Sequence, residues 1–285
     1  MYHRKIFRKV GLFSLTLPVY ILIFLPVIWL VSSSISNRSD LLSSPTTFFP
    51  KHPTLENYIN IFNPAKATSE VSKTFVRTLG NSFLISSSVT FIALFVGSLA
   101  AYALARINFP FRKGVMMGIL GTRMIPEVSL VIPLYLLASR LGLLNKPIVL
   151  IVTYLSFALP FAIWIMSGFF ETIPVELEDA ARIDGCSRMG ILYQVILPIS
   201  APGLISTSLF VFLSAWDEFF FALIFTSTVA TKTVPVAIAE FTGRYAVDIT
   251  AMMAGGVIAA IPPVILALIF QRYIISGLTA GAVKG

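Results

Sequence analysis

The sequence is poor in residues that hold metal ions or form disulfide bonds. Its 285 residues include one cysteine, Cys186, and two histidines, His3 and His52. A single cysteine excludes an internal disulfide framework and a four-cysteine metal site. Two histidines also offer little for a histidine-based metal or catalytic cluster, so we expect neither a metal site nor a catalytic centre.

The signatures of several enzyme classes are absent as well. The sequence contains no G-x-x-x-x-G-K-S/T phosphate-binding loop, no G-x-S-x-G nucleophile turn and no H-E-x-x-H zinc motif. We therefore expect no enzymatic activity on this chain. Any ATP hydrolysis that serves it must be catalysed by a separate subunit.

Charged residues are scarce. They make up 12% of the chain, against about a quarter in an average soluble domain, while 56% of the residues are hydrophobic. This composition is typical of a membrane protein. The net charge of +8 could indicate a nucleic-acid partner, but no basic stripe with interleaved aromatic residues accompanies it. We expect no nucleic acid and attribute the excess to membrane topology.

Long uncharged runs predict an all-α integral membrane protein with about six transmembrane helices, forming a single transmembrane domain over residues 1–285. The first run is longer than the apolar core of a signal peptide, about 7–15 residues, and lacks a clear A-x-A site, so we interpret it as a span. The expected spans lie at about residues 12–33, 79–105, 114–138, 147–170, 200–226 and 251–271.

Basic clusters near the span ends predict the orientation. Cytoplasmic loops are enriched in lysine and arginine, which places both termini and the loop of residues 172–198 in the cytoplasm. The loops of residues 37–75 and 227–248, the latter including Arg244, would then lie outside. The clusters that decide the orientation are Arg4, Lys5, Arg8 and Lys9 before the first span, and Arg106, Arg112 and Lys113 after the second.

One long polar segment lies between two apolar spans, and its pattern predicts a short helix. Pro174 fits the start of that helix, and Gly185 breaks the helical pattern after about two turns. The chain then returns to the apolar region through Leu197 and Pro198. A short charged helix that projects from the membrane is typical of a docking element.

This segment contains a spaced set of residues: Asp179, Ala180 and Ala181, then Gly185, and then Val195, Leu197 and Pro198. The set resembles the E-A-A, G, I-x-L-P signature of permease subunits of binding-protein-dependent ABC importers. It departs from that signature at two positions, where Asp179 replaces Glu and Val195 replaces Ile.

Other stretches extend the resemblance over most of the chain, from about Thr54 to Gly285. The basic loop of residues 101–113 and the Trp-acid-Glu-Phe stretch of residues 216–219 are similar to the family. The tail of residues 271–285 resembles that of maltose-type sugar permeases. Residues 54–62 resemble their extracytoplasmic segment, and the alternative for these residues is a surface helix that packs over the span ends.

The resemblance implies the permease subunit of an ATP-driven importer in a bacterial or archaeal cytoplasmic membrane. Its substrate would be a di- or oligosaccharide or a related glycoside. The implied partners are a second homologous permease, two ATPase subunits that bind ATP and Mg, and an extracytoplasmic solute-binding protein. No cofactor is implied on this chain itself.

In the family the loop of residues 172–198 forms the coupling helix, which sits in a cleft of the ATPase subunit and would transmit ATP-driven closure to the spans. Small side chains would allow close approach there, and the charged ones could form intersubunit ion pairs; the alternative is solvated cytoplasmic charge. The residues implied in ATPase coupling are Glu178, Asp179, Ala180, Ala181, Arg182, Asp184, Gly185, Arg188, Leu197 and Pro198.

Ionisable residues within the expected spans form a second group of candidates. Arg123 and Glu127 are four residues apart and could pair on one helix face, with Pro126 opening the helix between them. Acids beside aromatic rings suit a sugar, although an outer interfacial position would also explain them. The candidate substrate-pathway residues are Arg123, Glu127, Tyr154, Trp216, Asp217 and Glu218.

Two other functions stay open at this point. A stand-alone secondary transporter or channel would use the intramembrane charges as an ion-coupling or selectivity site, although the sequence shows no half-to-half repeat of the kind common in such transporters. An ABC importer for a non-sugar solute would share the signature loop.

Overall fold

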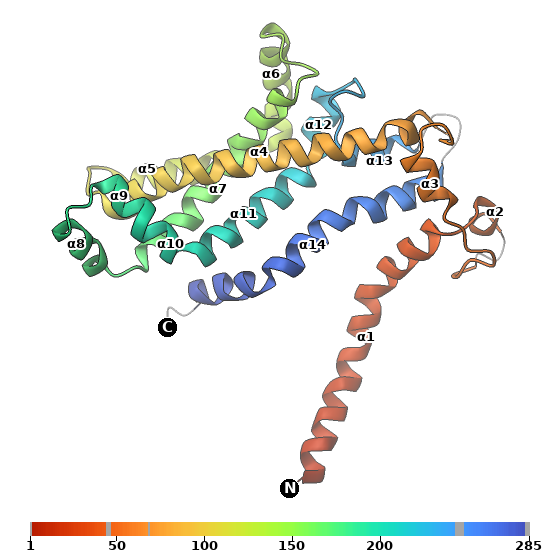
Figure 1. Cartoon of the computed structure of the whole chain (residues 1–285), viewed down its shortest axis with the longest axis horizontal. Helices are drawn as coiled ribbons and strands as arrows, with labels where there is room; N and C mark the ends of the chain where they lie inside the picture. Colours follow the sequence, from red (N-terminus) through yellow and green to blue (C-terminus); the bar gives the residue numbers. More distant parts are fainter. Residues whose placement is uncertain (1, 44–46, 68, 243–247, 283–285) are drawn as a thin grey trace. The chain divides into compact units, whose positions relative to one another are not determined.

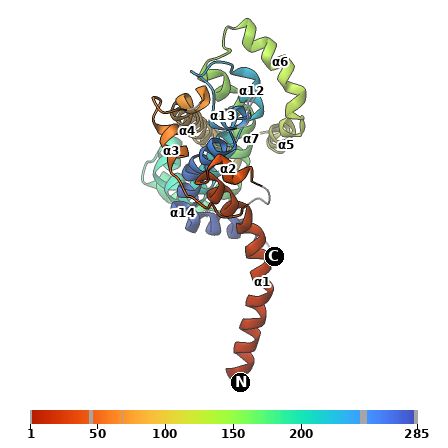
Figure 2. The ribbon, with the colours of Figure 1, turned by 90° about the vertical axis from the view of Figure 1, so that its right-hand side faces the viewer.

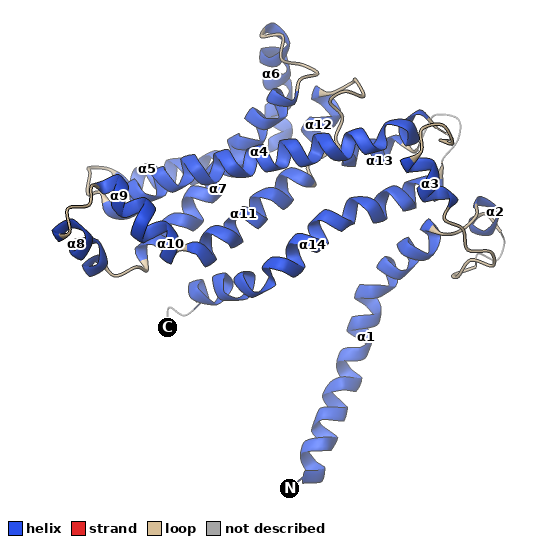
Figure 3. Ribbon diagram, viewed as in Figure 1, coloured by secondary structure: helices blue, strands red, loops and turns tan. Residues whose placement is uncertain are grey.

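The computed structural model describes residues 2–43, 47–67, 69–242 and 248–282, with side chains described for residues 16–43, 47–67, 69–242 and 248–273. Every regular element in this described part is helical, which confirms the all-α expectation (Figure 1 and Figure 3). Arg244 and the last three residues, assigned above to an external loop and a cytoplasmic tail, lie outside the described residues, as do the side chains of the N-terminal basic cluster.

Within the described residues, four helices are long and apolar enough to cross a membrane. Their apolar sequences match the spans expected at 12–33, 79–105, 147–170 and 251–271, although α4 starts earlier because the polar residues before Val76 continue the same helix. The four are α1 (Tyr2–Ser34), α4 (Glu70–Arg106), α7 (Pro147–Glu171) and α14 (Ile249–Ala282).

The third expected span is a bent pair of helices. Helix α5 (Arg112–Gly121) and the short η1 (Thr122–Met124) meet α6 (Glu127–Arg140) at 89° (Figure 1 and Figure 2). Pro126 lies in the break with extended backbone, as a residue without an N–H favours. The expected Arg123–Glu127 pair is wrong: the described side chains form no such ion pair, because the break removes them from a common helix face.

The fifth expected span is also divided. Helix α11 (Ala201–Trp216) ends before three non-helical residues, and α12 (Phe220–Phe225) follows. On its other side, α9 (Arg188–Ile191), η2 (Leu192–Ile196) and α10 (Leu197–Ile199) lead into α11 across an 81° bend. If each bent pair counts as one span, the described residues hold up to six candidate spans by length and composition.

The chain divides into two compact units. The first combines the described residues up to Val76 with Ala237–Ile261. In it, α3 (Glu56–Phe62) follows α2 (Arg38–Leu41) and covers the end of α1. The Asn57 amide donates to the carbonyl oxygens of Ser34 and Ser36 at 2.8 and 3.0 Å, so α3 is a helix that packs over the end of a span.

The second unit comprises Arg77–Val236 and the described residues from Pro262 onward. Within it α7 packs against α11, and a Cβ added at Gly203 would lie 2.4 Å from Cγ of Phe169. The core of this unit includes Tyr154, Phe170 and Ile196, all fully buried. The polar segment between α7 and α9 forms α8 (Val175–Ile183), and α13 (Val234–Glu240) crosses the boundary between the units.

Candidate coupling site

Helix α8 is the short helix that the sequence predicts between two apolar segments. Pro174 directly precedes it, and Glu176 and Glu178 lie in its first turn, where carboxylates interact favourably with the positive end of the helix dipole. The non-helical linker from α7 consists only of residues 172–174. Such a short linker places α8 directly beside the end of α7.

The end of α8 is defined by Gly185, as the sequence indicates. Gly185 has a φ of +85°; its N–H donates to the Arg182 carbonyl at 3.0 Å, and the Cys186 N–H donates to the Ala181 carbonyl at 2.9 Å. These two bonds form a Schellman motif. Glycine is favoured at this position because the backbone is left-handed there, which residues with a Cβ adopt less readily. A Cβ at Gly185 would meet no atom of this chain within 4 Å, so the space beside it is open to a partner.

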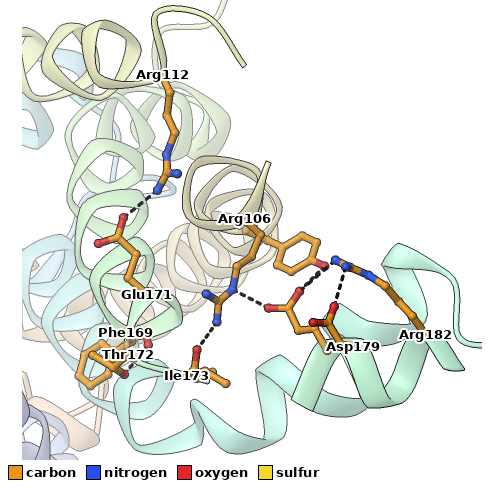
Figure 4. A network of polar contacts seen from close by, with 10 residues as sticks. Arg106, Arg112, Phe169, Glu171, Thr172, Ile173, Asp179 and Arg182 are labelled. Atoms are coloured by element: carbon orange, nitrogen blue, oxygen red, sulfur yellow. Dashed lines mark hydrogen bonds and ion pairs between the residues drawn. The ribbon is translucent and has the colours of Figure 1, made fainter. Parts of the chain in front are cut away.

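The carboxylate of Glu178 points into this chain. Its side chain is 1% exposed, and Oε1 lies 2.5 Å from Nε of Arg106, the last residue of α4. The Tyr102 hydroxyl, one turn earlier on α4, donates to Oε2 at 3.3 Å. Figure 4 shows the Arg106 side chain directed toward Ile173, with dashed lines marking its polar contacts. Glu178 is therefore an internal contact between α8 and α4 in this chain.

Arg106 also holds the linker that precedes α8. Its Nη2 donates to the Ile173 carbonyl at 2.6 Å, beside the ion pair with Glu178. The Arg106 side chain is only 10% exposed, and a buried charge of this kind is stable only when its partner is present. Removing one partner of such a pair costs about 3–5 kcal/mol, because the other charge stays buried without compensation.

The remaining charges of α8 lie at the surface. Arg182 pairs with Asp179 at 2.9 Å, and both side chains are more than half exposed. An exposed pair of this kind contributes up to about 1 kcal/mol. Asp184 and Arg188 are exposed and lie beyond the last turn of α8, which leaves them available to a partner.

Helix α8 exposes three large apolar side chains that the sequence analysis did not single out: Val175, Leu177 and, most of all, Ile183. Ile183 is 87% exposed and lies between the exposed Ala180 and Gly185. A single exposed apolar residue is ordinary, whereas several grouped on one surface mark an interaction site. In the sequence, the signal for Ile183 was an apolar residue in the last turn of a charged helix. Of the other coupling candidates, Leu197 packs against the core and Pro198 is exposed.

The ion pair between Arg112 and Glu171 lies near the Arg106–Glu178 pair but does not involve α8. Nη2 of Arg112, at the start of α5, lies 2.9 Å from Oε1 of Glu171, at the end of α7. The side chains are 30% and 49% exposed, and Figure 4 shows this pair away from Arg106. It joins two span ends at the surface.

The substrate-pathway candidates fall into two groups. Arg123, Glu127 and Asp217 are exposed. The guanidinium carbon of Arg123 lies 5.4 Å from the Phe161 ring centroid, within the range of a cation–π contact. Arg123 borders a cavity of about 250 Å³ whose other lining residues are Phe157, Ala158, Phe161, Phe210, Val211 and Ser214. Phe157 and Phe161 lie one turn apart on α7, a spacing that is equally typical of an ordinary core.

The other group is packed inside the chain. Tyr154 and Trp216 are 0% and 3% exposed, and the Tyr154 hydroxyl lies beside the Glu218 carboxylate. Glu218 also accepts hydrogen bonds from the N–H groups of Phe221 and Ala222 at 2.8 and 3.2 Å. It thus caps the first turn of α12, a structural role that the sequence did not indicate.

Comparisons with known proteins identify the family of this chain. Residues 93–279 match the family described as "Binding-protein-dependent transport system inner membrane component", and the chain belongs to this family. It is 40% identical, over 99% of both chains, to the trehalose/maltose transport system permease protein MalG of Thermococcus litoralis. It is 38% identical to the sulfoquinovosyl glycerol transport system permease protein SmoH of Agrobacterium fabrum, over 91% of this chain and 88% of SmoH.

The fold is also shared with a solved structure. A chain of a bacterial ABC transporter involved in the import of the acidic polysaccharide alginate superposes with a TM-score of 0.79 at 22% identity, covering 96% of this chain and 98% of the other. The protein is therefore a transport subunit and an inner-membrane component.

Proposed function

We propose that this chain is a transmembrane subunit of an ATP-driven importer for a di- or oligosaccharide or a related glycoside. The observation that carries the proposal is α8, a short helix between two spans whose exposed side offers Ile183, Ala180 and the open space at Gly185. The sugar class is supported by relatives and a structural neighbour that are named for trehalose/maltose, sulfoquinovosyl glycerol and alginate.

The exposed surfaces suggest the partners. The open side of α8 suits a cleft in one of two ATPase subunits. These subunits would bind ATP and Mg, since this chain has no phosphate-binding loop. Large exposed apolar residues on the α5–α6 pair, such as Met117 and Ile132, require cover by lipid or by a second homologous permease. An extracytoplasmic solute-binding protein would deliver the sugar, with both termini and α8 in the cytoplasm.

The cavity beside Arg123 is the candidate for the sugar path within this subunit. Its phenylalanine rings suit the C–H faces of a sugar, and Arg123 with Ser214 offers donors to hydroxyl or acidic groups. Glu127 and Asp217 would contribute acceptors, whereas Tyr154, Trp216 and Glu218 would shape the path from within the packed core. A solute other than a sugar is the second candidate, because the family as a whole is defined by its binding-protein dependence.

The test is purification of the assembled importer. The chain would be expressed with its neighbouring genes, purified through a tag, and assayed in lipid for ATPase activity with and without loaded binding protein. We expect an ATPase and a second permease to co-purify, and the loaded binding protein to stimulate hydrolysis several-fold. A chain that purified alone and moved solute without ATP would overturn the importer assignment, and stimulation by an amino acid but no sugar would overturn the sugar class.

A further inference from the structure

The contact between Arg106 and Glu178 joins the coupling helix to a different span from the one that precedes it in sequence. We propose that this pair, the α4–α8 tie, makes α8 and the end of α4 move as one rigid body. Displacement of α8 by a partner is then transmitted directly to α4. That a partner displaces α8 rests on the proposed function, whereas the α4–α8 tie is a set of contacts within this chain.

The tie removes the freedom that the linker would otherwise give. Only residues 172–174 separate α7 from α8, and a helix on such a linker could pivot about it. Arg106 holds the linker at the Ile173 carbonyl, 2.6 Å away, and holds the helix itself at Glu178, 2.5 Å away. Because both contacts come from one side chain at the end of α4, α8 cannot pivot without breaking at least one of them.

The chemistry of the pair suits a rigid contact. A guanidinium is planar and carries several N–H groups, so Arg106 contacts both segments at once: Nη2 donates to the Ile173 carbonyl, and Nε forms an ion pair with Glu178. Tyr102, on the same helix as Arg106, adds a second contact from α4 to Glu178. All of this is shielded from water, with Glu178 1% and Arg106 10% exposed, so solvent does not screen the attraction as it does at the surface.

The helix on the other side of the tie is long and continuous. Helix α4 runs without a break from Glu70 to Arg106, unlike the bent pairs on either side of α8 in sequence. A continuous helix passes a displacement at one end along its length, whereas a break absorbs part of it. The tie therefore gives α8 an unbroken route into the membrane.

The nearby Arg112–Glu171 pair provides a matched control. It has the same chemistry and lies close by, but it is more exposed, at 30% and 49%, and does not involve α8. We would compare Arg106→Met and Glu178→Gln with Arg112→Met and Glu171→Gln in the assembled importer. The two measurements are hydrogen exchange of the backbone amides of residues 173–183 and solute taken up per ATP hydrolysed.

The tie predicts at least tenfold faster exchange in Arg106→Met, and in Glu178→Gln a smaller increase because glutamine can still accept a hydrogen bond. Uptake per ATP should fall in the same order, while the two control variants match the wild type. Unchanged exchange in Arg106→Met would overturn the proposal. So would loss of the ATPase from Glu178→Gln without a change in exchange, since Glu178 would then be a direct docking contact.

Two further points keep the test decisive. If Arg106→Met does not assemble, Arg106→Lys replaces it in both measurements. Lysine keeps the charge but cannot make both contacts, so exchange of residues 173–183 should rise by an intermediate amount. No rise in exchange would count against the tie. If wild-type complexes show no ATP-driven uptake, the proposed function fails, yet the exchange measurement still decides whether the tie exists.

Discussion

At the scale of single residues, Gly185 combines two requirements that the sequence alone does not separate. Its backbone is left-handed, with a φ of +85°, which an alanine adopts at a cost of about 1–2 kcal/mol. Its missing side chain also leaves open space, since a Cβ there would meet no atom of this chain. The left-handed backbone allows α8 to end at this position, and the open space would let a partner approach.

Substitutions at Gly185 separate these requirements. Gly185→Asp should leave membrane insertion intact and abolish uptake, because its side chain would occupy the space proposed for the ATPase. Gly185→Asn has nearly the same shape and tolerates the left-handed backbone, so it should abolish uptake as well. The measurement is solute uptake by complexes shown to be assembled. Persistent uptake with either assembled variant would contradict the coupling assignment or the need for close approach.

Arg123 carries the clearest prediction for the substrate path. A guanidinium within a membrane span is costly unless it faces water or protein, and Arg123 borders the aromatic cavity beside Phe161. Arg123→Gln should raise the half-saturating sugar concentration for uptake at least several-fold while leaving basal ATP hydrolysis unchanged. Arg140→Gln, at the exposed end of α6, is the control. Equal uptake kinetics in both variants would remove Arg123 from the path.

At the scale of the elements, the packing of α7 against α11 depends on one glycine. A Cβ at Gly203 would lie 2.4–2.7 Å from atoms of the Phe169 ring, which is closer than packed carbon atoms allow. The ring or the helix must therefore shift. Gly203 was not among the sequence candidates, because a glycine near a span's start has several ordinary explanations.

Gly203→Ala should consequently destabilise the subunit by about 1–3 kcal/mol, the usual cost of overpacking. The measurement is the midpoint of thermal unfolding in detergent. Gly168→Ala, on the neighbouring helix with no atom near its added Cβ, should leave the midpoint unchanged or raise it. Combining Gly203→Ala with Phe169→Leu should recover part of the loss, and no recovery would mean that the strain lies elsewhere.

At the scale of the whole molecule, exposed apolar residues have different meanings in different elements. Ile132 on α6 and Ile183 on α8 are 72% and 87% exposed, but α6 belongs to a candidate span and α8 does not. Ile132 therefore needs to be covered by lipid or by another permease, and Ile183 is proposed to contact the ATPase.

Arginine at these two positions should produce different defects. Ile132→Arg should reduce insertion or pairing of the permeases, because arginine in a span costs about 2.5–3.5 kcal/mol at the membrane centre. Ile183→Arg should insert normally and reduce co-purification of the ATPase. Membrane-fraction yield and subunit stoichiometry distinguish the two results, and the reverse pattern would contradict the placement of both helices.

Much of this architecture follows from local rules. Hydropathy predicted the four continuous spans, since each needs only a long apolar run, and Gly185 marked the end of α8 because few other residues accept its backbone conformation. Pro126 indicated an opening of the third span. The same local rules failed for the Arg123–Glu127 pair, which assumed a continuous helix, and for the break after Trp216, where Glu218 caps a new helix.

By itself, then, the sequence determined the membrane class, the helical fold and the short helix α8, because composition, periodicity and a glycine-ended pattern are local properties. Its signature residues carried the family resemblance. Only the tertiary structure decided which charges of α8 face outward. It buried Glu178 against Arg106 and left its neighbour Asp179 at the surface. That choice depends on where α4 ends relative to α8, and no pattern within either segment encodes it.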